Sequence, residues 1–558
     1  MNLPKFEVGK VTVGQLVDTV ADQFGESAAV KYHTMGIDYS YAEFKNVCND
    51  VAKGFMALGI EKGEHVAIWG NNVPEWLYAQ FGTGKMGAVL VTVNTNYRNF
   101  ELEYLMKQSE ATTLVMIGGV ISDDEYIKVV NEVCPELKDC KPGNLESEKL
   151  PKFKRVVYIG DENLPGMYNW NEVIEMGKNI TDEQLMERQN SLDPDDVINM
   201  QYTSGTTGFP KGVMLTHTNL IGNAVSLGEC MELSEKDVMC IPVPFFHCFG
   251  CVLGTLTCLA TAATMAPVVK FTPVDVLETV QESKCTALHG VPTMFIAELE
   301  EMENKAYDTS HLRTGIMAGS PCPIEVMKKV VDDMGASEMC ITYGQTEASP
   351  GITMTRTSDS LERRVSTVGM ALPNVEVKIV APESGEELPS GVQGELCCKG
   401  YNVMKGYYNN PEATEGAIID EWLHTGDLAI MDESGYCKIT GRLKDMIIRG
   451  GENIYPREIE EFLYTNEKVK DVQVVGVPSE KYGEEVVAYI QVKPGDSASE
   501  DEMREFCKDK IAFHKIPAFF MFIDEYPVTA SGKIQKYKLR DDATKALGRK
   551  DAANIETA

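Results

Sequence analysis

Apolar positions in the first half of the chain alternate between stripes at helical spacing and short runs typical of buried strands. One predicted helix begins after a capping box formed by Ser40 and Glu43 and can end at Gly59. The runs 65–69 and 88–93 predict strands, with a helix between them. The apolar stripe of the first helix consists of Phe44, Val47, Val51, Phe55 and Leu58. This strand–helix–strand rhythm indicates an α/β fold with mostly parallel sheets covered by helices.

The pattern changes along the second half of the chain. Shorter alternating strands after about Pro373 predict a β-rich subdomain at about 373–441, and the charged segment at 442–445 predicts a domain boundary. We therefore expect a large N-terminal domain at 1–441, built on helix-flanked sheets, and a small α+β domain at 446–558. The other predicted strands are 156–159, 238–243, 314–318, 339–343, 375–380, 394–399, 446–448, 472–477 and 486–492, with a late helix at 457–464.

Two segments are expected to be peripheral. Residues 139–154 are polar and contain prolines, which predicts a surface excursion. The chain is expected to fray from about Asp541.

Charge limits the choice of partner. The 558 residues include 84 acidic and 52 basic ones, which gives a formal net charge of -32. A field of this sign repels nucleic acid and anionic membranes, so no nucleic-acid partner is expected. It also repels ATP, so a site for an anionic substrate must be locally positive.

The first residues lack a basic segment followed by an apolar one, and no apolar run has membrane-spanning length, which predicts a cytoplasmic protein. The fifteen cysteines are scattered and are expected to be reduced. Cys248 and Cys251 form a C-x-x-C pair without nearby partners, so we expect core or pocket lining and not a metal or redox site. The oligomeric state stays open, with a homodimer as one option.

The segment YTSGTTGFPKG at 202–212 concentrates hydroxyls, glycines and Lys211. Glycines let the backbone approach a ligand, and the hydroxyls and N–H groups can donate to phosphate oxygens. The order differs from the G-x-x-x-x-G-K-[S/T] loop, because Lys211 lies between Pro210 and Gly212. The sequence therefore predicts a polyphosphate-binding loop of another kind.

Five further segments supply groups that nucleotide and acyl chemistry need. They are PFFHCFG at 244–250, YGQTE at 343–347, HTGD at 424–427, GRLKD at 441–445 and PVTASGKIQK at 527–536. Together with the 202–212 loop, this set resembles the adenylate-forming (AMP-binding) superfamily, in its fatty acyl-CoA synthetase branch, over nearly the whole chain.

The resemblance implies an acid–thiol ligase that works in two steps with ATP, Mg²⁺ and CoA. A carboxylate attacks the α-phosphorus of ATP to give acyl-AMP and pyrophosphate, and the thiol of CoA then displaces AMP. The implied catalytic residues are Lys533, Thr346, Glu347 and His247, with Glu347 holding Mg²⁺. The implied ATP- and AMP-binding residues are Thr203, Ser204, Gly205, Thr206, Thr207, Gly208, Lys211, Gly319, Ser320, Tyr343, Gly344, Gln345, Thr346, Asp427, Arg442 and Lys533.

The resemblance also implies two sheets in the large domain and a hinge at 442–445, about which the small, mobile domain rotates between the two steps, with Lys444 as the pivot. In the second conformation Gly450, Gly451 and Glu452 would approach the pantetheine arm of CoA, and the glycines would allow close backbone contact.

The acyl pocket is implied at Phe245, Phe246, His247 and Cys251. Amino-acid-activating relatives usually carry an Asp where this chain has His247, so an ammonium-bearing substrate is disfavoured. We expect a medium- to long-chain fatty acid, with medium chain preferred. The alternatives are a benzoate-type acid, transfer to a carrier-protein phosphopantetheine, and a non-catalytic acyl or nucleotide sensor.

Overall fold

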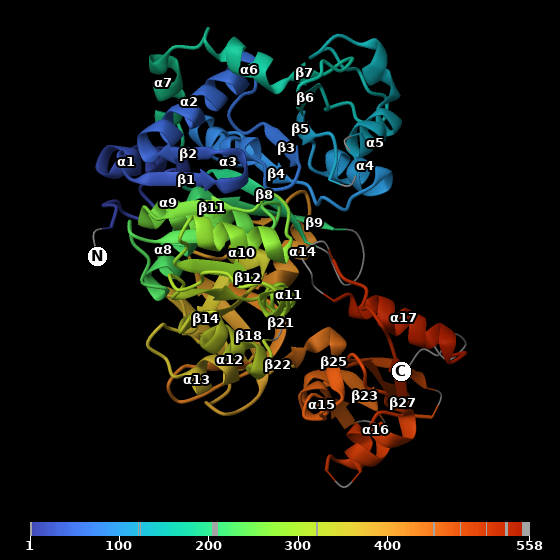
Figure 1. Cartoon of the computed structure of the whole chain (residues 1–558). Helices are drawn as coiled ribbons and strands as arrows, with labels where there is room; N and C mark the ends of the chain where they lie inside the picture. The colour runs from blue at the N-terminus through green and yellow to red at the C-terminus, as the bar shows by residue number, and fades with distance from the viewer. Residues whose placement is uncertain are drawn as a thin grey trace. The chain divides into compact units, whose positions relative to one another are not determined.

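The computed structural model describes residues 3–120, 122, 124–203, 210–319, 322–449, 452–479, 481–508, 510–529 and 534–549 (Figure 1). The chain divides into two compact units. The first comprises Met1–Val377 and Cys398–Leu423, and the second comprises Lys378–Cys397 and His424–Ala558. The predicted α/β fold class is confirmed, with two mostly parallel sheets, a β-rich region and an α+β C-terminal region.

The first unit contains an eight-stranded sheet that is parallel from β8 through β7. Its core includes Trp69 and Tyr126, whose rings stack with centroids 3.7 Å apart. The predicted strand 65–69 is confirmed as β3. In spatial order the strands are β19 (Gly406–Tyr407), β9 (Lys211–Thr216), β8 (Val197–Thr203), β4 (Val89–Thr92), β3 (His65–Trp69), β5 (Thr113–Ile117), β6 (Arg155–Ile159) and β7 (Tyr168–Asn169).

A nine-stranded sheet forms the second layer of the same unit and is parallel from β14 through β1. Figure 1 shows α10 and α11 beside its strands. In spatial order the strands are β16 (Met370–Ala371), β15 (Gly351–Met354), β14 (Glu338–Gly344), β13 (Thr314–Met317), β12 (Ala287–Gly290), β10 (Val238–Ile241), β11 (Thr264–Pro267), β1 (Ala28–Tyr32) and β2 (Ile37–Ser40).

Helix α2 (Tyr41–Ala57) illustrates how the sequence positions the helical layers. The predicted capping box is present, because the Ser40 side chain accepts from the Glu43 N–H while the Glu43 carboxylate accepts from the Ser40 N–H. Phe44 then packs edge-on against Phe81 of α3, with centroids 5.3 Å apart. The other helices of this unit are α1 (Val13–Phe24), α3 (Pro74–Met86), α4 (Asn99–Gln108), α5 (Glu125–Val133), α6 (Trp170–Gly177), α7 (Asp182–Asn190), α8 (His217–Cys230), α9 (Thr257–Thr261), α10 (Pro273–Glu282), α11 (Pro292–Asn304), α12 (Ile324–Asp333), α13 (Leu361–Ser366) and α14 (Pro411–Ala417).

A third, five-stranded sheet corresponds to the predicted β-rich region. The boundary between the two units falls within three of its strands. Its strands are β17 (Val375–Val380), β18 (Gly394–Gly400), β21 (Trp422–Met431) and β20 (Ile418–Ile419), with β22 (Cys437–Arg442) paired to β21.

The C-terminal sheet of the second unit has the order β24-β23-β26-β25, with β27 on β26. One apolar cluster involves α15 and α16, and another involves α17. The predicted domain boundary at 442–445 stays a prediction. The elements are β23 (Ile447–Arg449), β24 (Glu452–Ile454), α15 (Pro456–Leu463), β25 (Val469–Ser479), β26 (Gly483–Val492), α16 (Glu500–Cys507), β27 (Phe519–Phe522) and α17 (Lys536–Ala546).

One expectation about a peripheral segment was wrong, and another needs an addition. The segment 139–154 is mostly exposed, as expected, but the side chains of Leu145, Leu150 and Phe153 anchor it in the core beside the eight-stranded sheet. The expected fraying from Asp541 does not hold for 541–546, because α17 continues to Ala546. Scattered apolar residues anchor each segment despite its polar composition.

In the part of the chain that the structure describes, no helix combines the length and apolar character needed to cross a bilayer.

Candidate active site

The two ends of the predicted phosphate loop are held by a β-hairpin. Strands β8 and β9 pair antiparallel, and Thr203 lies opposite Lys211. The Tyr104 hydroxyl also donates to the Pro210 carbonyl, at 3.0 Å. The loop therefore starts and ends on a rigid support. The predicted loop residues lie outside the described residues, namely Ser204, Gly205, Thr206, Thr207 and Gly208.

Tyr407 connects the two predicted phosphate- and metal-binding motifs. Its hydroxyl donates to Glu347 Oε1 at 2.7 Å, and Lys211 Nζ lies 4.1 Å from the centroid of its ring. Burial, and then the neighbouring Glu347, raises the pKa of the Tyr407 phenol well above its usual value, so the hydroxyl keeps its proton and acts as a donor. One side chain thus holds a cation over the face of its ring and a carboxylate at its hydroxyl.

Sequence reasoning missed Tyr407. It lies in the segment 405–408, outside the six motifs. Strand β19 brings it to the site by pairing antiparallel with β9, where Tyr407 lies opposite Val213. This pairing joins strands that are far apart in the sequence, and a Gly-Tyr pair is a weak local signal.

Gly319 lies just after β13, and Tyr343 and Gly344 are the last residues of β14. These two strands are parallel neighbours, so the predicted residues lie at the carboxyl ends of adjacent strands, as is usual for ligand sites in α/β sheets. Gly319 has a φ of +90°. A Cβ at Gly344 would lie 1.8 Å from the Pro350 carbonyl oxygen, so a glycine is required there.

Near this edge, half-buried Tyr343 lies opposite Thr353, and the Gln345 N–H donates to the Pro350 carbonyl at 2.9 Å. Ser320 lies outside the described residues.

The segment after β10 brings His247 close to Thr346. Cys248 Sγ lies 3.7 Å from His247 Nδ1 and 3.9 Å from Thr346 Oγ1. The Phe249 N–H donates to His247 Nδ1 at 3.1 Å, which fixes the imidazole ring. Burial raises the pKa of the Cys248 thiol to about 12, so it stays neutral and serves as packing.

The predicted acyl-pocket residues Phe245, Phe246 and His247 precede a π-helix, η3 (Phe249–Leu256), which was not predicted and which contains Cys251. Phe245, Phe246 and Cys251 are buried, and His247 is half-buried. Cys251 Sγ accepts from Gln201 Nε2 at 3.2 Å. π-Helical turns are rare and often occur at functional sites.

Asp427 and Arg442 form a pair within the second unit. They lie opposite each other on β21 and β22, and Arg442 Nε is 2.8 Å from Asp427 Oδ1. Asp427 is 4% exposed, whereas the Arg442 side chain is 38% exposed. The predicted ribose-binding carboxylate is therefore held in one orientation by its arginine.

The predicted hinge and CoA-binding residues are only partly covered by the structure. Lys444 lies in a short 3₁₀ turn, η5 (Leu443–Asp445), and Glu452 begins β24. Gly450, Gly451 and Lys533 lie outside the described residues.

Within the first unit, the structure thus joins Lys211 to Glu347 through Tyr407, and Thr346 to His247 through Cys248. Thr346 and Glu347 are consecutive residues of one 3₁₀ turn, η4 (Thr346–Ala348). Three motifs that are far apart in sequence therefore meet.

Comparison with known proteins assigns this arrangement to a family. The profile described as "AMP-binding enzyme" matches residues 17–408. The chain belongs to the AMP-binding enzyme family. The profile of the family's C-terminal domain matches residues 458–533. The adenylate-forming resemblance of the six motifs is therefore confirmed.

Two relatives of this AMP-binding enzyme match almost its whole length. YngI of Bacillus subtilis (strain 168), provisionally named an acyl-CoA synthetase, is 60% identical over 95% of the chain and 96% of the relative. The mitochondrial medium-chain acyl-CoA ligase ACSF2 of Danio rerio is 40% identical over 96% of the chain and 89% of the relative. The chain lies in the acyl-CoA synthetase branch of the family, as predicted.

Solved structures of similar AMP-binding enzymes share the fold. ATP-bound MatB from Rhodopseudomonas palustris superposes with a TM-score of 0.80 at 28% identity, covering 96% of this chain and 100% of MatB. The o-succinylbenzoate CoA synthetase MenE from Bacillus subtilis, bound to its acyl-adenylate, superposes with a TM-score of 0.76 at 27% identity, covering 94% and 98% of the two chains.

Proposed function

We propose that the protein joins a fatty acid to CoA at the expense of ATP, through an acyl-AMP intermediate, with release of AMP and pyrophosphate. One observation carries the proposal: Lys211 lies over the ring of Tyr407 and Glu347 accepts from its hydroxyl, next to the hairpin that bounds the phosphate loop. This arrangement offers a positive charge and a metal-binding carboxylate at one place, which a bound triphosphate requires.

Charge explains why both groups are needed. Attack on ATP brings a carboxylate towards a polyanion inside a protein of net charge -32, so the site must neutralise charge as the transition state develops. Glu347 fits Mg²⁺, which prefers one or two carboxylates together with phosphate oxygens. Mg²⁺ would supply charge neutralisation, and Tyr407 would orient the Glu347 carboxylate through Oε1.

The remaining nucleotide contacts follow from the motifs. Asp427, oriented by Arg442, would accept hydrogen bonds from the ribose hydroxyls. Tyr343 would stack on adenine at the carboxyl edge of β14. The hydroxyls of the 203–207 segment would hold the terminal phosphates.

Lys533 is proposed to bridge the carboxylate and the α-phosphate in the first step only. Rotation of the small domain at Lys444 is then proposed to bring 450–452 to CoA. Lys533→Ala is expected to slow pyrophosphate release from ATP and fatty acid by roughly 10²- to 10³-fold, while conversion of supplied acyl-AMP to thioester continues. The two half-reactions are measured separately. Equal losses of rate in both half-reactions would contradict the proposed role of Lys533.

The substrate is proposed to be a medium-chain fatty acid. The buried side chains of Phe245, Phe246 and Cys251 support an apolar pocket, and the named substrate class of the ACSF2 relative supports this length. A second candidate is an aromatic acid, which the likeness to MenE supports.

The experiment is a measurement of pyrophosphate release across straight-chain acids of increasing length and benzoate-type acids, with and without free CoA. We expect the highest kcat/KM at medium chain length, with thioester formed from free CoA. A peak at benzoate-type acids would replace the proposed substrate. Turnover only with a carrier protein would mean that the acyl acceptor is a carrier-protein phosphopantetheine and not free CoA. Absence of turnover with all acids would refute the proposed ligase activity.

A further inference from the structure

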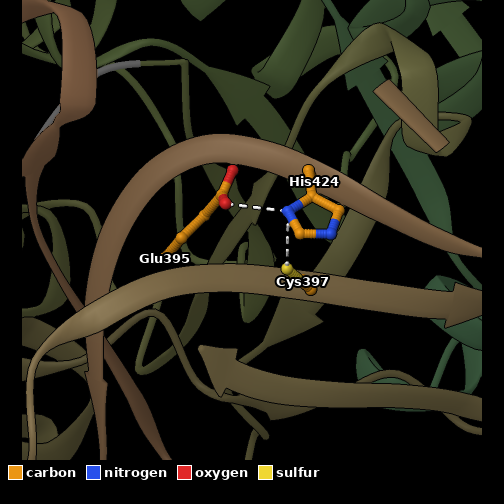
Figure 2. A group of neighbouring side chains, drawn as sticks. All are labelled: Glu395, Cys397 and His424. Atoms are coloured by element: carbon orange, nitrogen blue, oxygen red, sulfur yellow. Dashed lines mark hydrogen bonds and ion pairs between the residues drawn. The ribbon is translucent and has the colours of Figure 1, made fainter. Parts of the chain in front are cut away.

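Three side chains of the second unit, Glu395, Cys397 and His424, form a cluster at the turn that precedes Asp427. Glu395 and Cys397 lie two residues apart on β18, so their side chains share a face, and His424 lies on β21. Figure 2 shows them together: His424 Nδ1 is 2.8 Å from Glu395 Oε2 and 3.5 Å from Cys397 Sγ. All three offer metal-ligating atoms.

The distances favour direct hydrogen bonds over a metal centre. Oxygen and nitrogen ligands of one tetrahedral zinc ion would lie about 3.4 Å apart, which follows from metal–ligand bonds of roughly 2.1 Å. The observed 2.8 Å is a direct hydrogen-bond length. The other carboxylate oxygen, Glu395 Oε1, accepts from the Gly426 N–H, also at 2.8 Å. Burial and the adjacent Glu395 raise the pKa of the Cys397 thiol to about 12, so it stays protonated.

The bonds from Glu395 reach the turn that precedes Asp427. Gly426 has a φ of +71°, a conformation that favours glycine, and its N–H is the one bound by Glu395. The Thr425 hydroxyl donates to the Leu396 carbonyl at 2.6 Å and accepts from the Asp427 N–H at 3.1 Å. Strand β18 therefore fixes three consecutive residues, His424, Thr425 and Gly426, from one side.

We propose that Glu395 is a positioning residue: by accepting from His424 and from the Gly426 N–H, it sets the conformation of the HTGD turn and so aims the Asp427 carboxylate at the ribose hydroxyls of ATP. The inference rests on the proposed function, which assigns Asp427 to the ribose. Glu395 itself does not touch the nucleotide. It is 7% exposed, so losing one of its two acceptor oxygens leaves a buried donor unpaired, and the turn must shift to satisfy it.

Glu395→Gln is the direct test, because the amide keeps the shape and removes one acceptor. The measurement compares kcat and KM for ATP, 2′-deoxy-ATP and 3′-deoxy-ATP. We expect the KM for ATP to rise roughly tenfold, which corresponds to about 1.4 kcal/mol. The preference for ATP over the deoxy nucleotides should fall by a similar factor, while the KM values for acid and CoA stay unchanged. Asp427→Asn provides the reference for complete loss of ribose discrimination.

Two further variants keep the test decisive. His424→Gln removes the imidazole but can still donate to Glu395, so it should fold and give a smaller change in the same direction. The control is Glu421→Gln, which breaks an exposed pair with Lys399 on β18 and leaves the cluster intact. Its kinetics and ribose preference should equal those of the wild type.

Specific outcomes would overturn the inference. Unchanged ribose discrimination in folded Glu395→Gln would mean that Glu395 only stabilises the sheet. If Glu395→Gln does not fold, wild-type discrimination in His424→Gln would overturn the positioning role in the same way. Zinc bound at one equivalent to the purified protein and lost in Cys397→Ser would replace the positioning role with a metal centre. A wild type that turns over ATP and its deoxy analogues equally would refute the inference, whereas a wild type without ATP turnover would refute the proposed function itself.

Discussion

Tyr407 is the residue on which the arrangement of the phosphate end depends, since it contacts both Lys211 and Glu347. Tyr407→Phe keeps the ring under Lys211 and removes only the hydrogen bond to Glu347. We expect kcat for the first step to fall roughly tenfold, as for loss of a hydrogen bond to a charged group worth about 1.5 kcal/mol. The concentration of Mg²⁺ at half-maximal rate should rise.

The neighbouring Tyr408 supplies a matched control for this prediction. Its hydroxyl donates to Glu110, at 3.1 Å, away from the motif residues. Tyr408→Phe should therefore leave the rate and the Mg²⁺ dependence unchanged. Equal effects from the two variants would indicate that Tyr407 contributes packing and does not orient Glu347.

Glu298 on α11 gives a prediction about pH. The side chain is fully buried, and among the described residues neither of its carboxylate oxygens has a hydrogen-bond partner. Burial raises its pKa to about 8, whereas an unfolded chain has a value of roughly 4.3. The folded state therefore binds more protons than the unfolded state between these values. Stability must fall as pH rises through this window, by at most about 1.4 kcal/mol per pH unit for this group.

Glu298→Gln removes this ionisable group, so the variant lacks the loss of stability with rising pH. The Tm of the variant minus the Tm of the wild type should therefore increase steadily between about pH 5 and pH 8. Thermal unfolding at several pH values measures the difference. Glu300→Gln, on the exposed side of the same helix, is the control and should show no such trend. A constant difference for Glu298→Gln across the range would mean that Glu298 is ionised in the folded protein.

Among the helical elements, two glycines predict opposite effects on stability when each is replaced by alanine. In the π-helix, a Cβ on Gly250 would lie 2.3 Å from the Pro244 carbonyl oxygen, whereas a Cβ on Gly416 in α14 would meet nothing within 4 Å. Gly416→Ala should stabilise the protein by about 0.5 to 1 kcal/mol, because alanine favours the helix. Gly250→Ala should lower the Tm and the activity, because it displaces the segment that carries His247.

Thermal unfolding of the two variants, together with pyrophosphate release, tests this contrast. A Gly250→Ala variant with wild-type Tm and activity would show that the π-helix tolerates the added carbon, and the element would lose its proposed importance for the acyl pocket.

Elements with local signals could be predicted from the sequence, and those set by long-range packing could not. The capping box at Ser40 and the strand at 65–69 depend on neighbouring residues, and both have the predicted form. The π-helix depends on Gly250 and Gly254 lying against Pro244 and Ile241, a condition that no local periodicity expresses. Likewise, the polar segment 139–154 contains too few apolar residues to reveal that they are buried.

The same limit applies to the site. Motif spacing indicated Lys211, Glu347 and Asp427 as functional candidates, but Tyr407 and Glu395 act through contacts with those residues or with the turn beside them. Tyr407 reaches Glu347 only through the pairing of β19 with β9, and Glu395 reaches Gly426 from the neighbouring strand. Residues that orient a site carry no chemical signal of their own in a single sequence.

The formal charge of the whole molecule is -32, which repels ATP. Binding of ATP therefore depends on where individual cations are held. Lys211 and Arg442 each lie beside a group that fixes them, Tyr407 and Asp427 respectively. The chain separates into two compact units. The proposed pivot at Lys444 lies within the second unit, in a short 3₁₀ turn after β22.

In the proposed first step, the carboxylate itself attacks the α-phosphorus of ATP. The most direct test supplies a medium-chain fatty acid labelled with ¹⁸O at both carboxylate oxygens, together with Mg·ATP and CoA, and analyses the products by mass spectrometry. We expect AMP carrying one labelled oxygen, acyl-CoA retaining the other and unlabelled pyrophosphate, because the bridging oxygen leaves with AMP when the thiol attacks. Unlabelled AMP, or ADP and phosphate as the products, would contradict the account.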